Sequence, residues 1–266
     1  MAVKKTSVPD SVALQAAEET EKALAAIPQD LQDNAGQGVE TIGQDDVRPP
    51  RLLICQAGSP QRKPDDPKQI IGLNELDMFN DLSGEIYGRG PLKIVIVQAL
   101  GARHIQFAPM EEGGGVLDYD VKPTDPRALF TTNEKGERVK PVATKFYDYL
   151  AWLPDYQDII AWSLKSSQLK IALRVNGMMK LPLKFGGQVH MKPPAWARTF
   201  SLTTAMEKSD SFSWGSYNLK NEGVTDEDTR EICKTLYDSY SKKNVVIERD
   251  DHDDDTLSNA QAEAGM

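Results

Sequence analysis

The chain has 266 residues and a formal net charge of −9, and its hydrophobic and charged contents of 39% and 27% are typical of a soluble globular protein with polar appendages. No apolar run approaches the roughly 18–20 residues that a membrane-spanning helix needs, and no secretion signal follows the first methionine. The two cysteines, Cys55 and Cys233, lie far apart without neighbours at metal-ligand spacing, which favours a reducing cytoplasm.

Residues 1–47 are expected to form an arm outside the core. The stretch 10–27 is rich in Ala and Glu, has apolar residues at helical spacing, and is ended by Pro28. The residues that follow, up to 46, are rich in Gly, Gln, Asp and Asn, as linkers are. We therefore predict a weak helix followed by a disordered linker; a helix that docks on a partner is the alternative.

The folded core is expected to span residues 48–247. Short runs of β-branched and apolar residues, bounded by Pro, Gly and polar residues, predict six or seven strands. The predicted strands are 51–56, 92–100 with its continuation 103–107, 146–153, 158–164, 196–205 and 212–219. The stretch 111–145 contains three consecutive glycines and alternating charges, and we expect a long excursion from the sheet there.

Two helices are predicted within this core. The first begins near Ser166 or Ser167, and its Lys170 and Arg174 share a solvent-facing side because they are four residues apart. The second begins at Thr225 and runs to about residue 243; its predicted buried side consists of Ile232, Leu236 and Tyr240. The predicted class is mainly β with added helices (α+β), with an OB-like β-barrel as the core.

Residues 248–266 are expected to form a disordered acidic tail. Its acidic run consists of Asp250, Asp251, Asp253, Asp254 and Asp255. A flexible polyanion tethered near a cationic surface competes weakly with nucleic acid for that surface. Binding of a strand would then release the tail for a partner protein. The alternative is a terminus that only improves solubility.

The sequence offers little for catalysis. It has no phosphate-binding Gly-x-x-x-x-Gly-Lys motif, and Gly88-Arg89-Gly90 is followed by Pro91, which cannot open a dinucleotide-binding helix in the usual way. The three histidines are widely separated, and none has a Cys, Asp or Glu partner at metal-ligand spacing in a predicted element. We therefore expect a protein that is not an enzyme and needs no metal or cofactor.

The charge pattern points to nucleic acid instead. Residues 159–206 contain no Asp or Glu, although the chain as a whole is acidic. The cations of this acid-free run are Lys165, Lys170, Arg174, Lys180, Lys184, Lys192 and Arg198. Aromatic residues interleave with the run or flank it, among them Tyr147, Tyr149, Trp152, Trp196 and Trp214. Phosphate neutralisation together with base stacking is how proteins hold single strands without sequence preference.

Several segments carry a family resemblance. They are Arg48-Pro-Pro-Arg-Leu-Leu-Ile-Cys-Gln, Phe79-Asn-Asp-Leu-Ser-Gly-Glu-Ile-Tyr-Gly before the strand at 91–97, Tyr149-Leu-Ala-Trp, Leu164-Lys-Ser-Ser-Gln-Leu-Lys and the aromatic hairpin at 200–217. Their order resembles the single-stranded DNA-binding proteins of tailed bacteriophages, an OB-fold group. The resemblance implies a role in phage replication or recombination in the host cytoplasm, with an acidic tail that contacts replication or recombination proteins. This tail ends in Ala-Glu-Ala-Gly-Met, not in the acidic-aromatic tip of the bacterial proteins.

The sequence therefore predicts a sequence-tolerant single-stranded DNA-binding protein. The seven cations would neutralise phosphates, and Trp152, Trp196, Trp214 and the nearby Tyr147 and Tyr149 would stack on bases. Of all the aromatic residues in and around the run, which also include Trp162, Phe185, Phe200, Phe212 and Tyr217, two or three are expected to be exposed on the basic face. One alternative is a protein-interaction or virion-assembly factor with a basic docking face. Another is a nuclease or recombinase subunit, for which Asp118 and Asp120 are the first residues to test.

Overall fold

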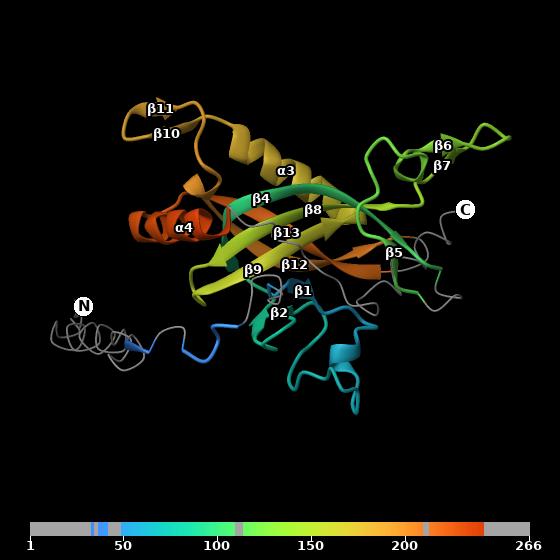
Figure 1. Cartoon of the computed structure of the whole chain (residues 1–266), viewed down its shortest axis with the longest axis horizontal. Helices are drawn as coiled ribbons and strands as arrows, with labels where there is room; N and C mark the ends of the chain where they lie inside the picture. The colour runs from blue at the N-terminus through green and yellow to red at the C-terminus, as the bar shows by residue number, and fades with distance from the viewer. Residues whose placement is uncertain (1–32, 35–36, 42–48, 110–113, 210–212, 242–266) are drawn as a thin grey trace, which may run out of the picture. The chain divides into compact units, whose positions relative to one another are not determined.

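The structure is a computed structural model that describes residues 33–34, 37–41, 49–109, 114–209 and 213–241. The chain divides into two compact units, Met1–Val47 and Arg48–Met266. The strands and helices described below all belong to the second unit (Figure 1).

The second unit is built on one antiparallel sheet. Its five long strands lie in the order β13-β12-β4-β8-β9, and the short strand β5 (Val116–Asp118) pairs with the end of β4 (Figure 1). The long strands are β4 (Leu92–Phe107), β8 (Thr144–Leu153), β9 (Asp158–Lys165), β12 (Arg198–Lys208) and β13 (Ser213–Val224). β4 is predicted from sequence as 92–100 with the continuation 103–107, and the two parts form one strand.

β4 stays continuous because it bends. Its pairing with β8 shifts register twice, between Ile96 and Gln98 and between Ala99 and Gly101. Such bulges increase the local twist of a strand. Gly101 has a φ of +100°, a conformation that residues with a side chain rarely adopt. The first residues of β4 pair with β12 and the later ones with β8, so one bent strand joins the two halves of the sheet.

Both faces of the sheet are buried. One face carries the main core, which includes Tyr149 and Trp162 and is covered by helix α3 (Leu169–Lys180). The other face carries a smaller core around Val97 and Leu150, against which helix α4 (Glu227–Tyr240) packs. Strands buried on both faces lose the alternation of apolar and polar residues that would show from sequence which side is solvent-exposed.

Helix α4 differs from its prediction in two respects. Its N-cap is Asp226, whose carboxylate accepts a hydrogen bond from the amide of Thr229 at 2.9 Å; the predicted cap was Thr225. Cys233 lies at the centre of the buried side, whereas the predicted Ile232 is 43% exposed. Burial of Cys233 raises the pKa of its thiol to about 12.

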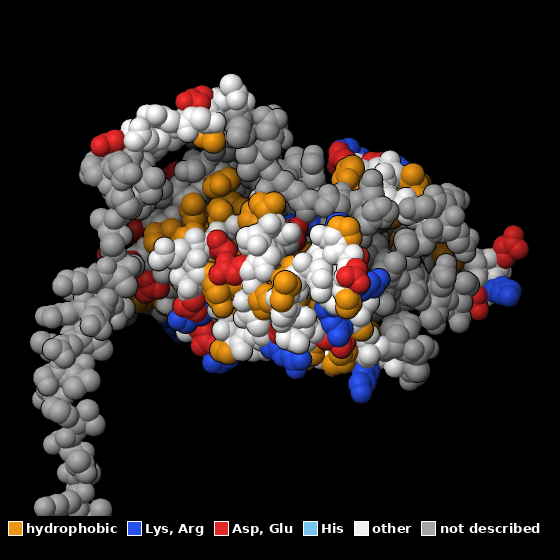
Figure 2. Space-filling view, turned by 90° about the horizontal axis from the view of Figure 1, so that it is seen from below, with side chains coloured by type: hydrophobic (Ala, Val, Ile, Leu, Met, Phe, Trp, Pro, Cys, Tyr) orange, Lys and Arg blue, Asp and Glu red, His pale blue; other side chains and the backbone are white. Residues whose placement is uncertain are grey.

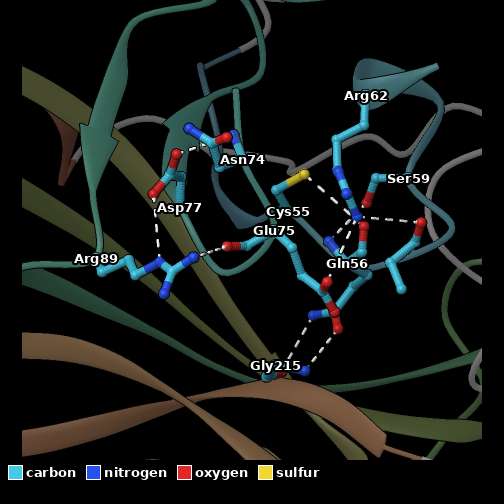
Figure 3. Close-up of polar contacts among 10 residues, drawn as sticks. Cys55, Gln56, Ser59, Arg62, Asn74, Glu75, Asp77, Arg89 and Gly215 are labelled. Atoms are coloured by element: carbon cyan, nitrogen blue, oxygen red, sulfur yellow. Dashed lines mark hydrogen bonds and ion pairs between the residues drawn. The ribbon is translucent and has the colours of Figure 1, made fainter. Parts of the chain in front are cut away.

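A small three-stranded sheet closes the main core on another side. It consists of β1 (Leu52–Ile54), β2 (Met78–Asn80) and β3 (Ile86–Gly88), and the short 3-10 helix η2 (Pro60–Arg62) follows β1. The segment 50–56 contacts both edge strands of the large sheet. At one end the amide of Ala161 in β9 donates to the carbonyl of Pro50 at 2.7 Å. At the other end the Gln56 side chain pairs with the backbone of Gly215 in β13, at 2.7 and 3.1 Å (Figure 3).

Gly215 is closely approached by side chains at this crossing. A Cβ atom there would lie 2.7 Å from a methyl of Leu76 and 3.0 Å from one of Ile54, closer than packed atoms approach. The absence of a side chain therefore lets the segment 50–56 lie against β13.

The predicted class, mainly β with added helices, is confirmed. A closed barrel is not found: in the described residues β9 and β13 are the two edges of the sheet and are not paired with each other. The excursion between β4 and β8 contains the 3-10 helix η4 (Pro126–Ala128) and the hairpin of β6 (Thr131–Thr132) and β7 (Arg138–Val139). No helix in the described part is long and apolar enough to cross a membrane.

Several short strands are absent from the prediction, among them β2 and β3. After α3 the chain also forms a second small hairpin of β10 (Leu183–Phe185) and β11 (Gln188–His190), where no strand is predicted. Gly186 and Gly187 form its tip with φ of +57° and +77°. Two consecutive residues with positive φ make the tight turn that glycine pairs favour, so the Gly-Gly dipeptide was the available signal.

Candidate nucleic-acid interface

The seven cations of the acid-free run lie along and at both ends of helix α3. Lys165 ends β9, the 3-10 helix η5 (Ser166–Gln168) follows, and Lys170 lies in the first turn of α3. Lys180 ends α3, and Lys184, Lys192 and Arg198 follow in and after the β10–β11 hairpin. A 12-residue helix rises about 18 Å. The cations of the run therefore form two separate groups, one near each end of α3, and Arg174 is exposed on the helix between them.

The first group surrounds η5. Trp214 at the start of β13 donates from its indole Nε1 to Ser167 Oγ at 3.0 Å. Lys170 binds Glu207 of β12 at 2.6 Å, and Glu207 lies directly opposite Trp214 in the β12–β13 pairing. The start of β8 also packs against η5. We call Lys145, Tyr147, Lys165, Lys170 and Trp214 the η5 cluster.

Two lysines of this cluster lie over aromatic rings. Lys145 Nζ is 4.9 Å from the centre of the Tyr147 ring, and Lys165 Nζ is 5.8 Å from that of Phe146. Because successive strand residues point to opposite faces, the two pairs lie on opposite sides of β8. The cluster thus wraps around the end of the sheet, and its rings and cations come from β8, β9, α3 and β13.

The five aromatic residues predicted to stack on bases differ in burial and in location. Tyr149 is 1% exposed, and its hydroxyl contacts Asn176 Oδ1 at 2.9 Å and the Ala172 carbonyl at 3.2 Å in the core. Trp152 packs into the smaller core beneath α4, and Trp196 packs against Tyr237 of α4, with ring centres 5.0 Å apart and ring planes tilted by 44°. Of the five, Tyr147 and Trp214 are the half-buried rings of the η5 cluster; Tyr147 lies beneath Lys145, and Trp214 contacts Ser167 of η5.

The local charge at the η5 cluster comes from lysine. His104 lies directly opposite Lys145 in the β4–β8 pairing and is buried. Desolvation, followed by the positive charge of Lys145, lowers the pKa of His104. The imidazole is therefore neutral at physiological pH and leaves Lys145 as the cation on this side.

The second group centres on the β10–β11 hairpin. Lys180, Lys184 and Lys192 are exposed, and within the described residues none of them makes an ion pair. Arg198 has a structural role: its Nη2 donates to the carbonyls of Leu181 and Pro182 at 3.2 and 3.1 Å, which fixes the chain after α3. We call Lys180, Lys184 and Lys192, with the exposed apolar residues Phe185, Val189 and Met191, the hairpin cluster.

Two arginines on the side of β1–β3 lie close to acidic residues. Figure 2 shows the side of β1–β3, where Lys and Arg side chains are interspersed with Asp and Glu. Arg89 lies 3.9 Å from Asp77 and donates to the Glu75 carbonyl at 3.1 Å, as Figure 3 shows. Arg62 lies 3.6 Å from the Glu75 carboxylate. On this side Arg62 and Arg89 lie beside acidic residues, in contrast to the exposed Lys180, Lys184 and Lys192.

A comparison with protein families gives one result. A family model described as Pam3 phage gp34-like protein matches residues 18–246, most of the chain. The chain belongs to this family. The match supports the bacteriophage part of the resemblance drawn from the sequence. Comparisons with curated proteins and with solved structures gave no match.

Two further sites were predicted for this gp34-like chain, the acidic tail and a pair of carboxylates for a nuclease. The acidic run Asp250, Asp251, Asp253, Asp254 and Asp255 lies outside the described residues. Asp118 lies 3.2 Å from Arg127, and Asp120 pairs with Lys122. Among the described residues no group of three or more His, Cys, Asp and Glu side chains could hold a metal ion. The two carboxylates proposed for a nuclease are thus engaged with cations.

Proposed function

We propose that this chain binds single-stranded DNA without sequence preference through the η5 cluster, and that it acts by binding alone, without a chemical step. The observation that carries the proposal is the convergence at η5 of half-buried aromatic rings and lysines from four elements. Single strands bind to this combination because every base offers a face for stacking and every nucleotide a phosphate.

The strand order supports the same proposal. In chain order the long strands β4, β8, β9 and β12 lie in the spatial order 4-1-2-3, the Greek-key arrangement, with β13 added beside the fourth. An OB fold is a five-stranded, partly open Greek-key barrel that binds oligonucleotides on its second and third strands and adjoining loops. We propose that this sheet is OB-like. Its second and third strands are then β8 and β9, the strands that carry Lys145, Tyr147 and Lys165.

The segment 50–56 supports an OB-like core in another way. It contacts β9 at Ala161 and β13 at Gly215, so it fills the side on which the sheet stays open. The interior is thereby covered although the edge strands do not pair. The binding surface is left on the outside, at the end where β8 begins and β9 ends.

Fluorescence titration tests the proposal directly. Trp214 is the tryptophan of the η5 cluster, whereas Trp162 is fully buried and Trp152 and Trp196 pack beneath or beside α4. Adding oligo-dT should quench the emission of the wild-type protein, and duplex DNA of equal length should quench it far less. In Trp214→Phe the quench should disappear while anisotropy of a labelled oligo-dT still reports binding, because phenylalanine retains a ring that stacks.

Two results would refute this assignment. Binding of oligo-dT that is independent of salt would remove the phosphate contacts on which the mechanism depends. A full quench in Trp214→Phe would move the contact to another tryptophan and away from the η5 cluster.

A further inference from the structure

The hairpin cluster and helix α4 form a second surface with exposed apolar side chains. Phe185 and Val189 are each 53% exposed and Met191 is 67% exposed, and Ile232 and Tyr237 of α4 are also exposed. Concentrations of exposed apolar residues on a protein mark interaction sites. Apart from Phe185 and Tyr237, these side chains are aliphatic and cannot stack on bases, which favours a protein partner.

The two halves of this surface are adjacent. The guanidinium of Arg230 in α4 lies 5.7 Å from the ring of Phe185 in β10, and Leu183 in the same strand is buried. Phe185 and Leu183 share one face of the hairpin, so this face lies toward α4. Lys184 and Val189, directly opposite each other in the β10–β11 pairing, lie on the other face.

The halves carry opposite charge. The hairpin half has Lys180, Lys184 and Lys192, and no acidic residue occurs between 159 and 206. The α4 half exposes four carboxylates, those of Glu227, Asp228, Glu231 and Asp238, and carries two cations, Arg230 and Lys234, so it is anionic on balance. Glu227, Glu231 and Asp238 recur at helical spacing and line one outward side of the helix, together with Lys234.

We propose that this surface joins two copies of the chain in a two-fold dimer, in which the hairpin cluster of each copy lies on α4 of the other. A two-fold axis places the same patch of both copies face to face, so a residue i that contacts j is matched by j contacting i. A patch with a cationic half beside an anionic half is complementary to itself under this symmetry. The dimer then has two equivalent contacts, and each of them buries exposed apolar residues of one hairpin and one α4.

DNA fits this surface less well than a second copy does. The carboxylates of α4 would repel phosphates that approach the hairpin lysines, because like charges brought together cost several kcal/mol. The same carboxylates attract the lysines of a second copy. The dimer does not depend on the proposed DNA binding, since the η5 cluster lies at the other end of α3.

A charge-swap experiment tests the dimer with the full-length chain. Sedimentation and light scattering should give twice the chain mass of 29.5 kDa for the wild type. In Lys184→Glu/Lys192→Glu both halves become acidic. In Glu231→Lys/Asp238→Lys both become basic, because the two new lysines together with Arg230 and Lys234 outnumber the remaining Glu227 and Asp228. Each variant should be monomeric, with self-association weakened by more than about tenfold, because both contacts of its dimer then juxtapose like charges. An equal mixture of the two should restore the dimer mass, because both contacts of the mixed dimer pair opposite charges.

The matched control is Lys63→Glu/Lys135→Glu, which makes the same charge change at exposed lysines away from this surface and should remain dimeric. Circular dichroism and thermal melting establish that each variant is folded. As a second measurement, zero-length cross-linking of a mixture of isotope-labelled and unlabelled wild-type chains should give mixed-isotope peptides that join the hairpin to α4.

The proposal is overturned by a monomeric wild type at every soluble concentration, or by an assembly larger than two chains. It also fails if Lys184→Glu/Lys192→Glu or Glu231→Lys/Asp238→Lys on its own remains dimeric, or if the mixture of the two remains monomeric. Hairpin-to-α4 cross-links found only within chains of one isotope would place the contact inside one copy.

Discussion

The two ends of helix α3 present lysines in different settings. At the η5 end Lys145 and Lys165 lie over aromatic rings and Lys170 is held by Glu207. At the hairpin end Lys180, Lys184 and Lys192 extend from an exposed element and are accompanied by aliphatic side chains. The stretch without acidic residues supplies Lys165 and Lys170 at one end and all three lysines at the other, whereas Lys145 precedes this stretch.

The difference shows that cations alone do not define a ligand; their neighbours do. Lysines beside rings match a ligand with phosphates and stacked bases. Lysines beside aliphatic residues, with carboxylates on an adjacent helix, match a protein surface of the same composition. The first three predictions below change one end of α3 and use the other end as their reference.

The largest effect is expected from Gly215→Ala, which acts next to the η5 cluster. The added methyl would lie 2.7 Å from a methyl of Leu76 and 3.0 Å from one of Ile54, so these side chains must move away from β13. Overpacking of this kind costs about 1–3 kcal/mol of unfolding free energy, measured by urea denaturation. The extent to which oligo-dT quenches Trp214 fluorescence should also decrease, because Trp214 directly precedes Gly215.

Gly177→Ala is the reference at the other end of α3. No atom lies within 4 Å of a Cβ placed there, and glycine inside a helix costs roughly 0.5–1 kcal/mol relative to alanine. This variant should be more stable than the wild type by about that amount. A stable Gly215→Ala variant with full quenching would mean that the crossing at Gly215 does not position the η5 cluster.

The second prediction separates the two lysine groups by salt dependence. For single strands the slope of log K against log salt is about −0.7 per phosphate contact. Lys145→Ala/Lys165→Ala should therefore make the slope shallower by about 1.4 and weaken binding on the order of tenfold at moderate salt. Lys184→Ala/Lys192→Ala removes the same charge at the hairpin end and should leave the slope unchanged. The reverse pattern would move the DNA interface to the hairpin.

The strands and helices of the second unit could largely be predicted from sequence because their boundaries are local. The strand at 92–100, the strands at 146–153 and 158–164 and the helix after Ser166 follow from β-branched runs and from punctuation by Pro, Gly and Ser. The β10–β11 hairpin was missed because its strands have three residues each, too few to show an alternation.

The site was predicted only in part because its decisive contacts are not local. Lys170 is paired with Glu207, 37 residues away and just outside the acid-free run. Tyr149 and Trp152 belong to a strand buried on both faces, so no periodicity distinguishes a core ring from an exposed one. The aromatic residues could be located from sequence, but their exposure depends on which helices cover the two faces.

The third prediction concerns the hairpin end through α4. Asp226→Ala removes the cap of the Thr229 amide and should lower the unfolding free energy by about 1 kcal/mol. The hydrogen bond from the Thr229 amide lowers the pKa of Asp226. The stabilisation by this carboxylate is therefore complete above the usual aspartate pKa and is lost as the pH falls through the lowered value.

Thermal melting between neutral and acidic pH checks this prediction. The difference between wild type and Asp226→Ala should shrink as the pH falls, and Asp226→Asn, which keeps a cap without the charge, should lie close to the wild type at neutral pH. The dimer should weaken in Asp226→Ala, whereas the quench at the η5 cluster should stay. Loss of quenching with an intact dimer would reverse the assignment of functions to the two ends.

The smallest effect is expected from Glu207→Gln. It tests whether Lys170 leaves its ion pair with Glu207 to bind a phosphate or serves only to stabilise the fold. Lys170 is largely exposed and its pair with Glu207 is worth on the order of 0.2–1 kcal/mol, the usual range for exposed ion pairs. If Lys170 must leave Glu207 to contact a phosphate, glutamine removes that competition and should tighten oligo-dT binding by about two- to fivefold.

Glu222→Gln is the matched control, because Glu222 pairs with Lys220 in the same way on β13, away from η5. Equal effects in the two variants would show a general change of charge, and weaker binding in Glu207→Gln would mean that the ion pair holds Lys170 in its binding position.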